Sequence, residues 1–464
     1  MNAPTPVDLG RHTNDPKWVA EHNARHMWHP MIDPKASTAN PPMVIDRADG
    51  VYVYDTEGRR YLDCIASLWN VNVGHNRPEV KAAIVEQLDR LAYYQTFAGV
   101  SNPLAIALST LLTDMLAPED MSQVFFSSGG SDAVETAFKL ARQYWKLEGQ
   151  PERTKIFSLK DAYHGVHFGG ASANGNPRFR RAYEPLLPGF FQVENPNAYR
   201  NPWNESDPAR LARLCAELLD REIQYQGADT VAAFIAEPVQ GAGGMIVPPA
   251  EYWPLVREVC DRHGVLLIAD EVVTGFGRTG SLFGSRGWGV KPDIMALAKG
   301  INSGYVPLGA TVVNTRVASA WQKESAQAAI MHGYTYSGHP LACAAALACQ
   351  KIVIEEDLPG NSATVGAYFL ERINALRERH EVIGDTRGRG LMLTIECVKD
   401  RQSKTPFGPA DSFGPRLSRT ANDLGALVRW SNSRIILSPP LVFTREHVDE
   451  AVGILDQAFS TTPV

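Results

Sequence analysis

Lys299 stands where a short apolar run gives way to a loop of small and polar residues. Residues 293–298 read DIMALA, which has the length and composition of a strand, and residues 300–310 are rich in Gly, Ser, Asn and Pro. A lysine in this place contributes little to solubility, but its amine is well placed to meet a small aldehyde. The alternative is a lysine that caps the strand or extends its charge into solvent, which is the commoner use of a single lysine.

Asp270 ends a second apolar run, VLLIAD, and precedes Lys299 by 29 residues (299 − 270). A carboxylate at the end of a buried strand is partly desolvated and needs a cation or hydrogen-bond donors. A helix cap or a structural salt bridge is the alternative interpretation.

Gly129, Gly130 and Ser131 follow a third apolar run and open a helical segment. Glycines allow a close approach of the backbone, a helix N-terminus offers free N–H groups, and the serine adds a hydroxyl, so the combination suits a phosphate. An ordinary serine-capped helix is the alternative. The loop is neither GxGxxG nor a nucleoside-triphosphate loop.

A phosphate cradle, a buried carboxylate and a lysine together match the needs of pyridoxal 5′-phosphate. The loop would hold the phosphate, Asp270 would pair with the protonated ring nitrogen, and Lys299 would form the Schiff base. The three features are far more specific together than any one of them alone.

The elements that must position these residues alternate through the middle of the chain. Strand-like runs cover residues 123–127, 155–159, 231–237, 265–270, 293–298 and 308–314, and helical spacing marks 132–147, 207–224 and 250–263. Apolar strands separated by helices predict a mostly parallel sheet covered on both faces. Ligands bind beyond the carboxyl ends of such strands, so the three features would face one space.

Two further regions flank this sheet. Residues 43–63 predict a small sheet, and after Pro340 the patterns predict helices to about 356 and over 362–379, strands at 389–398, 427–430 and 434–437, and a terminal helix. We therefore predict an N-terminal arm and small sheet over 1–75, a large α/β domain over 76–340, and a C-terminal α+β domain over 341–464 that takes in the N-terminal sheet. The polar stretch 398–415, broken by Pro and Gly, is expected to be a loop.

Composition excludes several classes of partner. A formal net charge of −6 and the lack of a basic run argue against nucleic acid and anionic membranes. No apolar stretch approaches about 18 residues, so no transmembrane helix is expected. The first 18 residues lack an apolar core and are expected to form a flexible arm, not a secretory signal. The six scattered cysteines have no CxxC and no metal spacing, which indicates a reducing cytoplasm and no metal site.

Several stretches of the sequence resemble class III aminotransferases, which are pyridoxal-phosphate enzymes, in their order along the chain. They read FFSSGGSDAVETAFKLAR, AYHG, IAEPVQGAGG, LLIADEVVTGFGRTG, LAKGINSGYVPLGA and HGYTYSGHPLA. LWNVNVGHN and ILSPPLVFTREHVDEA resemble the omega-transaminases (amine:pyruvate aminotransferases) in particular. The resemblance runs from about Trp28 and implies the fold type I architecture, with a mostly parallel seven-stranded sheet in the large domain. It also implies a homodimer, or a tetramer, with shared active sites.

Matching motif positions assign roles around the cofactor. By this resemblance Lys299 is the Schiff-base lysine and the general acid and base, and Asp270 is the partner of the ring nitrogen. Val272 and Tyr163 would lie on the two ring faces, Gly130 and Ser131 would hold the phosphate, Thr335 would reach the phosphate of the other subunit, and Glu237 would lie near the ring. Without the resemblance, Tyr163 would be interpreted as a packing residue and Thr335 as a turn hydroxyl.

The substrate side is less determined. Arg429 matches the position of a mobile arginine that binds the acceptor carboxylate in omega-transaminases, an interaction that suits a guanidinium. Arg434 is a competing candidate, and both could be surface residues at a strand end. Trp69 and Phe97 match aromatic pocket positions, with core packing as the alternative. Trp430, next to Arg429, is expected to trim the pocket.

The sequence therefore predicts an omega-transaminase that moves an amino group from a primary amine or ω-amino acid to a keto acid, with pyruvate as the expected acceptor, by a ping-pong mechanism. One alternative is an aminotransferase for β-alanine, taurine, 4-aminobutyrate or a polyamine such as putrescine. Others are a non-transaminating relative or a catalytically silent cofactor-binding protein. The missing GxGxxG motif disfavours an NAD-dependent dehydrogenase.

Overall fold

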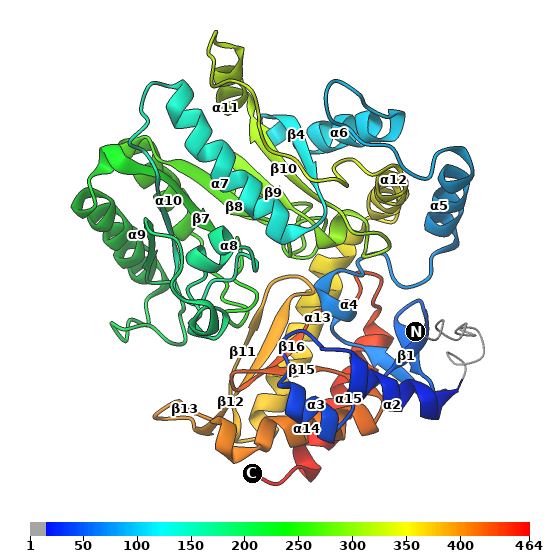
Figure 1. The fold of residues 1–464 in the computed structure, drawn as a ribbon. Coiled ribbons are helices and arrows are strands. Elements are labelled where there is room, and N and C mark those ends of the chain that lie inside the picture. The colour runs from blue at the N-terminus through cyan, green and yellow to red at the C-terminus, as the bar shows by residue number, and fades with distance from the viewer. Residues whose placement is uncertain (1–14) are drawn as a thin grey trace, which may run out of the picture.

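A seven-stranded sheet forms the upper half of the molecule in Figure 1, a computed structural model that describes residues 15–464. The strand order is β4-β10-β9-β8-β7-β5-β6. The strands are β4 (Met121–Ser127), β5 (Lys155–Leu159), β6 (Phe190–Val193), β7 (Val231–Ala236), β8 (Leu266–Asp270), β9 (Ile294–Leu297) and β10 (Gly309–Asn314). Only β10 runs antiparallel to its neighbours. The α/β fold with a mostly parallel seven-stranded sheet is thus confirmed.

Helices cover both faces of this sheet. They are α6 (Pro103–Met115), α7 (Gly130–Leu147), α8 (Phe168–Ala173), α9 (Pro208–Tyr225), α10 (Tyr252–His263), α11 (Thr315–Ser319) and α12 (Pro340–Glu355), and α5 (Pro78–Arg90) packs against α12. Successive side chains of a strand point to opposite faces. Accordingly Leu266 and Ile268 of β8 join the core under α7, while Leu267 joins the core under α9 and α10. Burial on both faces explains why β8 reads as an unbroken apolar run.

Two smaller sheets lie in the lower half. The first has the order β1-β2-β3-β14, and the second has the order β11-β12-β16-β15 with β13 beside β12. Their strands are β1 (Ile45–Asp49), β2 (Tyr52–Asp55), β3 (Arg60–Asp63), β11 (Ile383–Gly388), β12 (Leu393–Asp400), β13 (Thr405–Pro406), β14 (Ala426–Leu427), β15 (Arg429–Ser431) and β16 (Arg434–Leu437). β14 pairs in parallel with β3, so a C-terminal segment completes the N-terminal sheet. The domain boundaries near residues 75 and 340 stay a prediction.

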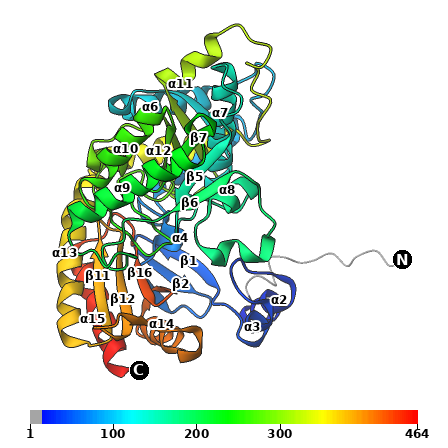
Figure 2. The same ribbon diagram turned by 90° about the vertical axis from the view of Figure 1, so that its left-hand side faces the viewer.

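The remaining helices are α2 (Pro16–His26), α3 (Pro34–Ala39), α4 (Ala66–Trp69), α13 (Leu358–Arg379), α14 (Phe413–Asp423) and α15 (Arg445–Thr461). Figure 2 shows α2 and α3 at the edge of the molecule. The flexible arm expected over residues 1–18 lies outside the described residues up to position 14, and from Pro16 the chain is helical. The loop expected over 398–415 was wrong in part. β12 continues to Asp400, and α14 begins at Phe413 because Phe413, Leu417 and Ala421 form one buried face.

Candidate active site

Polar side chains from five segments gather beyond the carboxyl ends of the large sheet. Lys299 follows β9, Asp270 ends β8, Glu237 follows β7, and Tyr163 follows β5. The fifth segment is the start of α7 at Gly130, which follows β4. These segments are spread over residues 130–299, and the sheet topology brings them to one edge.

Lys299 presents an amine with no hydrogen bond or ion pair to any described residue, and its side chain is half-buried. Burial lowers the pKa of its ammonium, while the charges of Asp270 and Glu237 act in the opposite direction. A lowered pKa leaves more of the amine neutral, which is the form that attacks a carbonyl. The geometry and the charge environment therefore both suit a reactive lysine.

The backbone at Lys299 adopts an unusual conformation. Its φ of +47° lies in the left-handed region, which costs a non-glycine residue roughly 1–2 kcal/mol. The next residue must be small, because a Cβ at Gly300 would lie 2.3 Å from the side-chain nitrogen of Asn72. Gln350 donates to the carbonyls of Gly300 and Ile301, at 3.0 and 2.8 Å. These contacts fix the strained turn that aims the lysine.

Asp270 is 4% exposed and has a donor on each carboxylate oxygen. The backbone N–H of Val272 donates to Oδ1 at 3.1 Å, and His164 Nδ1 lies 2.8 Å from Oδ2. The carboxylate therefore has the partners that a buried acid needs. His164 belongs to the AYHG motif, and no role was predicted for it from the sequence. Nothing in one sequence signals this pairing, because the two residues are 106 positions apart.

Glu237 is a second buried acid in the same space. Its oxygens accept from the backbone N–H groups of Tyr163 at 3.2 Å and Gly241 at 2.8 Å. Burial raises its pKa to about 7, with a further increase from Asp270 and a decrease from His164. Near neutral pH this carboxyl can therefore hold or release a proton.

The start of α7 forms a cradle of close backbone contacts. A Cβ at Gly130 would lie 2.8 Å from Cγ1 of Val272, so only glycine fits there without movement. Ser131 Oγ accepts from the N–H of Val166 at 3.1 Å, and Gly165 (φ +103°) passes directly over Ser131. No side chain caps this helix. Its first N–H groups thus remain available for an anion.

These observations fit pyridoxal 5′-phosphate. The uncapped helix start beside Gly130 and Ser131 suits the phosphate, the doubly hydrogen-bonded Asp270 suits a protonated ring nitrogen, and the unpaired Lys299 amine suits the aldehyde. Tyr163 and Val272 contact this space from different segments. Tyr163 packs edge-on against Phe179, with ring centroids 4.8 Å apart.

Arg429 and Arg434 differ in what holds them. Arg434 is bound to Glu396 at 3.1 Å and to the carbonyl of Gly243 at 2.9 Å. Arg429 has no hydrogen bond or ion pair to a described residue, and its guanidinium lies 5.6 Å from the ring centroid of Trp69. Trp69 itself is 7% exposed and packs against Gly241. Of the two arginines, Arg429 is therefore the one free to bind a carboxylate.

Trp430 does not line this space, contrary to the expectation that it trims the pocket. A Cβ at Gly414 would overlap the Trp430 indole, and Phe413 packs edge-on against it at 6.0 Å. Neighbouring residues of a strand point to opposite faces, so Trp430 faces α14 while Arg429 faces Trp69.

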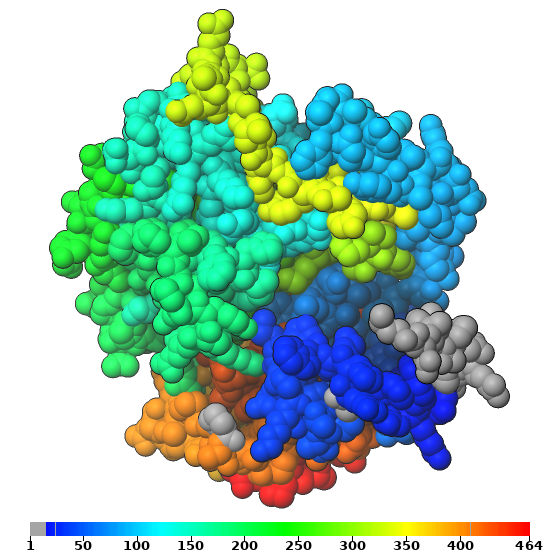
Figure 3. All heavy atoms as spheres, in the orientation of Figure 1, coloured from blue at the N-terminus to red at the C-terminus, as the bar shows by residue number. Residues whose placement is uncertain are grey.

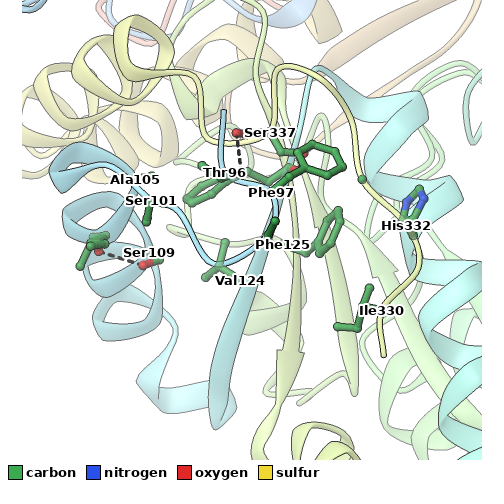
Figure 4. A pocket seen from close by; sticks show the side chains of 14 residues that line it. Thr96, Phe97, Ser101, Ala105, Ser109, Val124, Phe125, Ile330, His332 and Ser337 are labelled. Carbon is green, nitrogen blue, oxygen red and sulfur yellow. Dashed lines mark hydrogen bonds between the residues drawn. The ribbon is translucent and has the colours of Figure 1, made fainter. Parts of the chain in front are cut away.

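Phe97 and Thr335 lie apart from the buried group. Both are exposed, and Tyr93 donates to the backbone carbonyl of Thr335 at 2.7 Å. Phe97 lines a surface hollow of about 410 Å³ that contains Phe125 and His332 (Figure 4) and none of Lys299, Asp270 or Arg429. Residues 320–339 cross the face seen in Figure 3 as a raised segment. Within one subunit, neither residue reaches the space around Lys299.

Comparisons with known proteins identify the family of this chain. The Aminotransferase class-III family matches residues 34–459. A PLP-bound amine transaminase from an uncultivated Pseudomonas species is 54% identical, with a TM-score of 0.93, over 94% of this chain and 99% of that one. An (S)-enantioselective omega-transaminase from Thermomicrobium roseum is 42% identical, with a TM-score of 0.92, over 96% and 98%. Putrescine–pyruvate aminotransferase of Pseudomonas aeruginosa is 35% identical over 96% of both chains.

Fold and site together define a pyridoxal-phosphate enzyme of fold type I. The chain belongs to the class III aminotransferases, and its cofactor is pyridoxal 5′-phosphate. The predictions of the family, the fold, the cofactor and an aminotransferase activity are confirmed. Within residues 15–464, no helix is long and apolar enough to cross a membrane.

Proposed function

We propose that this aminotransferase moves an amino group from a primary amine or ω-amino acid to a keto acid, with pyruvate as the acceptor. The observation that carries the proposal is the pair formed by the unpaired Lys299 amine and the unpaired Arg429 guanidinium in one space walled by Trp69 and Tyr163. An amine beside acids can move protons, and a free guanidinium can take the acceptor's carboxylate.

We assign roles to the residues as follows. Lys299 would anchor the cofactor, and its amine would take up the proton that the substrate carbon loses. Asp270, oriented by Val272 and His164, keeps a positive charge on the ring nitrogen. Gly130 and Ser131 hold the phosphate, Tyr163 and Val272 enclose the ring, and Glu237 stays within reach of it. The bound cofactor supplies an electron sink for the carbanion formed when the substrate loses a proton.

Arg429 would bind the keto acid in one half-reaction and leave room for an uncharged amine in the other. Its contact with Trp69 supports this, because a stacked guanidinium without an ion pair gives up little when it turns toward a substrate. Trp69 would form the inner wall. The alternatives are 4-aminobutyrate, β-alanine or taurine, and polyamines such as putrescine, as donors, and 2-oxoglutarate as the acceptor.

A homodimer with shared active sites completes the proposal, with Phe97 and Thr335 serving the partner's site. Apolar side chains near Phe97 support a partner surface. Tyr94 is 51% exposed, Met331 is 93% exposed and Tyr336 is 56% exposed. A cytoplasmic location is proposed on the six free and buried cysteines.

The test is a two-step titration of the purified holoenzyme. An amine donor should bleach the visible absorbance, and pyruvate should restore it faster than 2-oxoglutarate does at equal concentration. Arg429→Leu should slow the pyruvate step and spare the step with an uncharged amine. Recovery with 2-oxoglutarate alone would overturn the acceptor assignment, and no bleaching with any primary amine would overturn the donor class.

A further inference from the structure

The chain after α8 forms a cover over Tyr163. Figure 2 shows it looping outward before it returns to β6. Phe179, in the short helix Pro177–Phe179, makes the edge-on contact with the Tyr163 ring. Asn176 accepts from the N–H of Arg178 at 3.1 Å, and Arg180 donates to the carbonyl of Asn174 at 3.3 Å and to Gln192 at 3.0 Å. The cover is therefore held in place from both sides.

Arg178 carries an uncompensated charge on this cover. Its side chain is exposed, lies 5.9 Å from the Phe179 ring centroid, and makes no hydrogen bond or ion pair with a described residue. Its charge reaches inward, because burial lowers the pKa of Arg429 and Arg178 lowers it further. Arg178 lies beside Phe179, Phe179 packs on Tyr163, and Tyr163 is near enough to Arg429 for their charges to interact. Neither guanidinium has an acid partner among the described residues.

This arrangement differs from the other arginines near the site. Arg200, Arg387 and Arg434 all pair with the buried Glu396, so their charges are partly offset. Arg180 pairs with Glu184 at 3.8 Å. Arg178 and Arg429, by contrast, have no acid partner among residues 15–464.

We infer that Arg178 is a specificity-determining residue, the outer cation of a two-arginine approach to the site that favours substrates with an anionic distal group and disfavours diamines. This inference rests on the proposed function and decides among its donors. Two positive charges attract the carboxylate of a keto acid or an ω-amino acid, and they repel the second ammonium of a diamine. Because Arg178 is exposed, its effect acts largely on association and is screened by salt.

The experiment uses three four-carbon donors of the same length. They are 4-aminobutyrate with an anionic tail, butylamine with a neutral tail and putrescine with a cationic tail. The holoenzyme is assayed at two ionic strengths, about 10 mM and about 300 mM. At the lower ionic strength, Arg178→Gln should lower kcat/KM about 5-fold for 4-aminobutyrate and for pyruvate. It should leave butylamine unchanged and raise kcat/KM for putrescine. At high salt these differences should shrink to less than about 2-fold.

Arg181→Gln is the matched control, since Arg181 is an exposed arginine on the same cover and is not among the charges that act on the pKa of Arg429. It should leave all four values unchanged, while Arg178→Lys should keep the order of the three donors. Equal effects of Arg178→Gln on the three donors, or effects that persist at high salt, would overturn the inference. A wild-type enzyme that transaminates none of the donors would instead overturn the proposed function.

Discussion

At the scale of residues, the pairing of Asp270 with His164 and Val272 determines how firmly the acid is held. Both oxygens of Asp270 accept hydrogen bonds, and Asn at this position would keep the shape but lose the charge. We expect Asp270→Asn to retain the cofactor and to lose about 100-fold or more in turnover, as for the loss of one fixed electrostatic contact in an active site. Cofactor absorbance and single-turnover rates with an amine donor measure the two quantities. Near-normal half-reaction rates would contradict the role assigned to Asp270.

Glu237 makes the stability of the protein depend on pH. Burial raises its pKa to about 7, whereas in the unfolded chain it titrates near its ordinary value of about 4.3. A raised carboxyl pKa means that the folded state holds the proton longer. The contribution of Glu237 to the free energy of unfolding is therefore fully present below about pH 4.3. It is lost as the pH rises toward 7, by a total on the order of 3 kcal/mol.

Glu237→Gln removes this ionisation. We expect Tm of the wild-type apoprotein to fall more steeply between pH 5 and 7 than Tm of the variant, when both are measured by thermal unfolding in buffers of constant ionic strength. The variant starts from a lower Tm, because an amide cannot accept from both Tyr163 and Gly241. Parallel pH profiles would show that Glu237 titrates normally in the folded protein.

Lys299 and Asp270 could be found from the sequence, because each ends an apolar run and a charge there is conspicuous. His164 could not, since its partner lies on another strand and only the strand order brings them together. The sequence could not distinguish Arg429 from Arg434 for the same reason, because only the structure shows that Glu396 forms an ion pair with Arg434.

At the scale of elements, the start of α7 combines two glycines with different environments. A Cβ at Gly130 meets Val272 at 2.8 Å, but a Cβ at Gly129 meets nothing within 4 Å, and Gly129 has an extended φ of 177°. Gly130→Ala should push Val272 or the helix start out of place, at a cost of about 1–3 kcal/mol. We expect its dissociation constant for pyridoxal phosphate to rise about 10-fold.

Gly129→Ala is the control for this prediction and should bind the cofactor as the wild type does. Titration of both apoproteins with pyridoxal phosphate, followed by absorbance, gives the comparison. Equal affinities of the two variants would show that the close approach at Gly130 has no part in holding the cofactor.

Strands that are buried on both faces could be predicted, whereas β6 and α14 were missed. β8 is apolar throughout, so it could be predicted. β6 has four residues at the edge of the sheet and was missed. α14 was missed because Gly414 and Pro415 suggest a loop, although Pro is tolerated in the first turn of a helix. Trp430 was misplaced for a related reason, since its partner Phe413 belongs to that unpredicted helix.

At the scale of the whole molecule, Glu396 joins segments that are far apart in the sequence. It is 1% exposed and pairs with Arg200 from the chain after β6, Arg387 on β11 and Arg434 on β16. Burial alone would raise the pKa of Glu396, but the three guanidinium groups hold it at about 2. Arg387 and Arg434 also donate to the carbonyls of Gly244 and Gly243, respectively, in the loop that follows Glu237.

Glu396→Gln would leave three guanidinium groups around a neutral amide. Losing one partner of a buried charge network costs about 3–5 kcal/mol, so we expect Tm to fall by several degrees and proteolysis between the large sheet and the small sheets to become faster. Glu355→Gln is the control, because its pair with Lys351 has a separation of 3.8 Å and both side chains are more than 60% exposed. Such a surface pair contributes at most about 1 kcal/mol. Equal losses of stability in the two variants would show that the Glu396 network contributes no more than an exposed ion pair, and that the loop beside Glu237 is held by its own contacts.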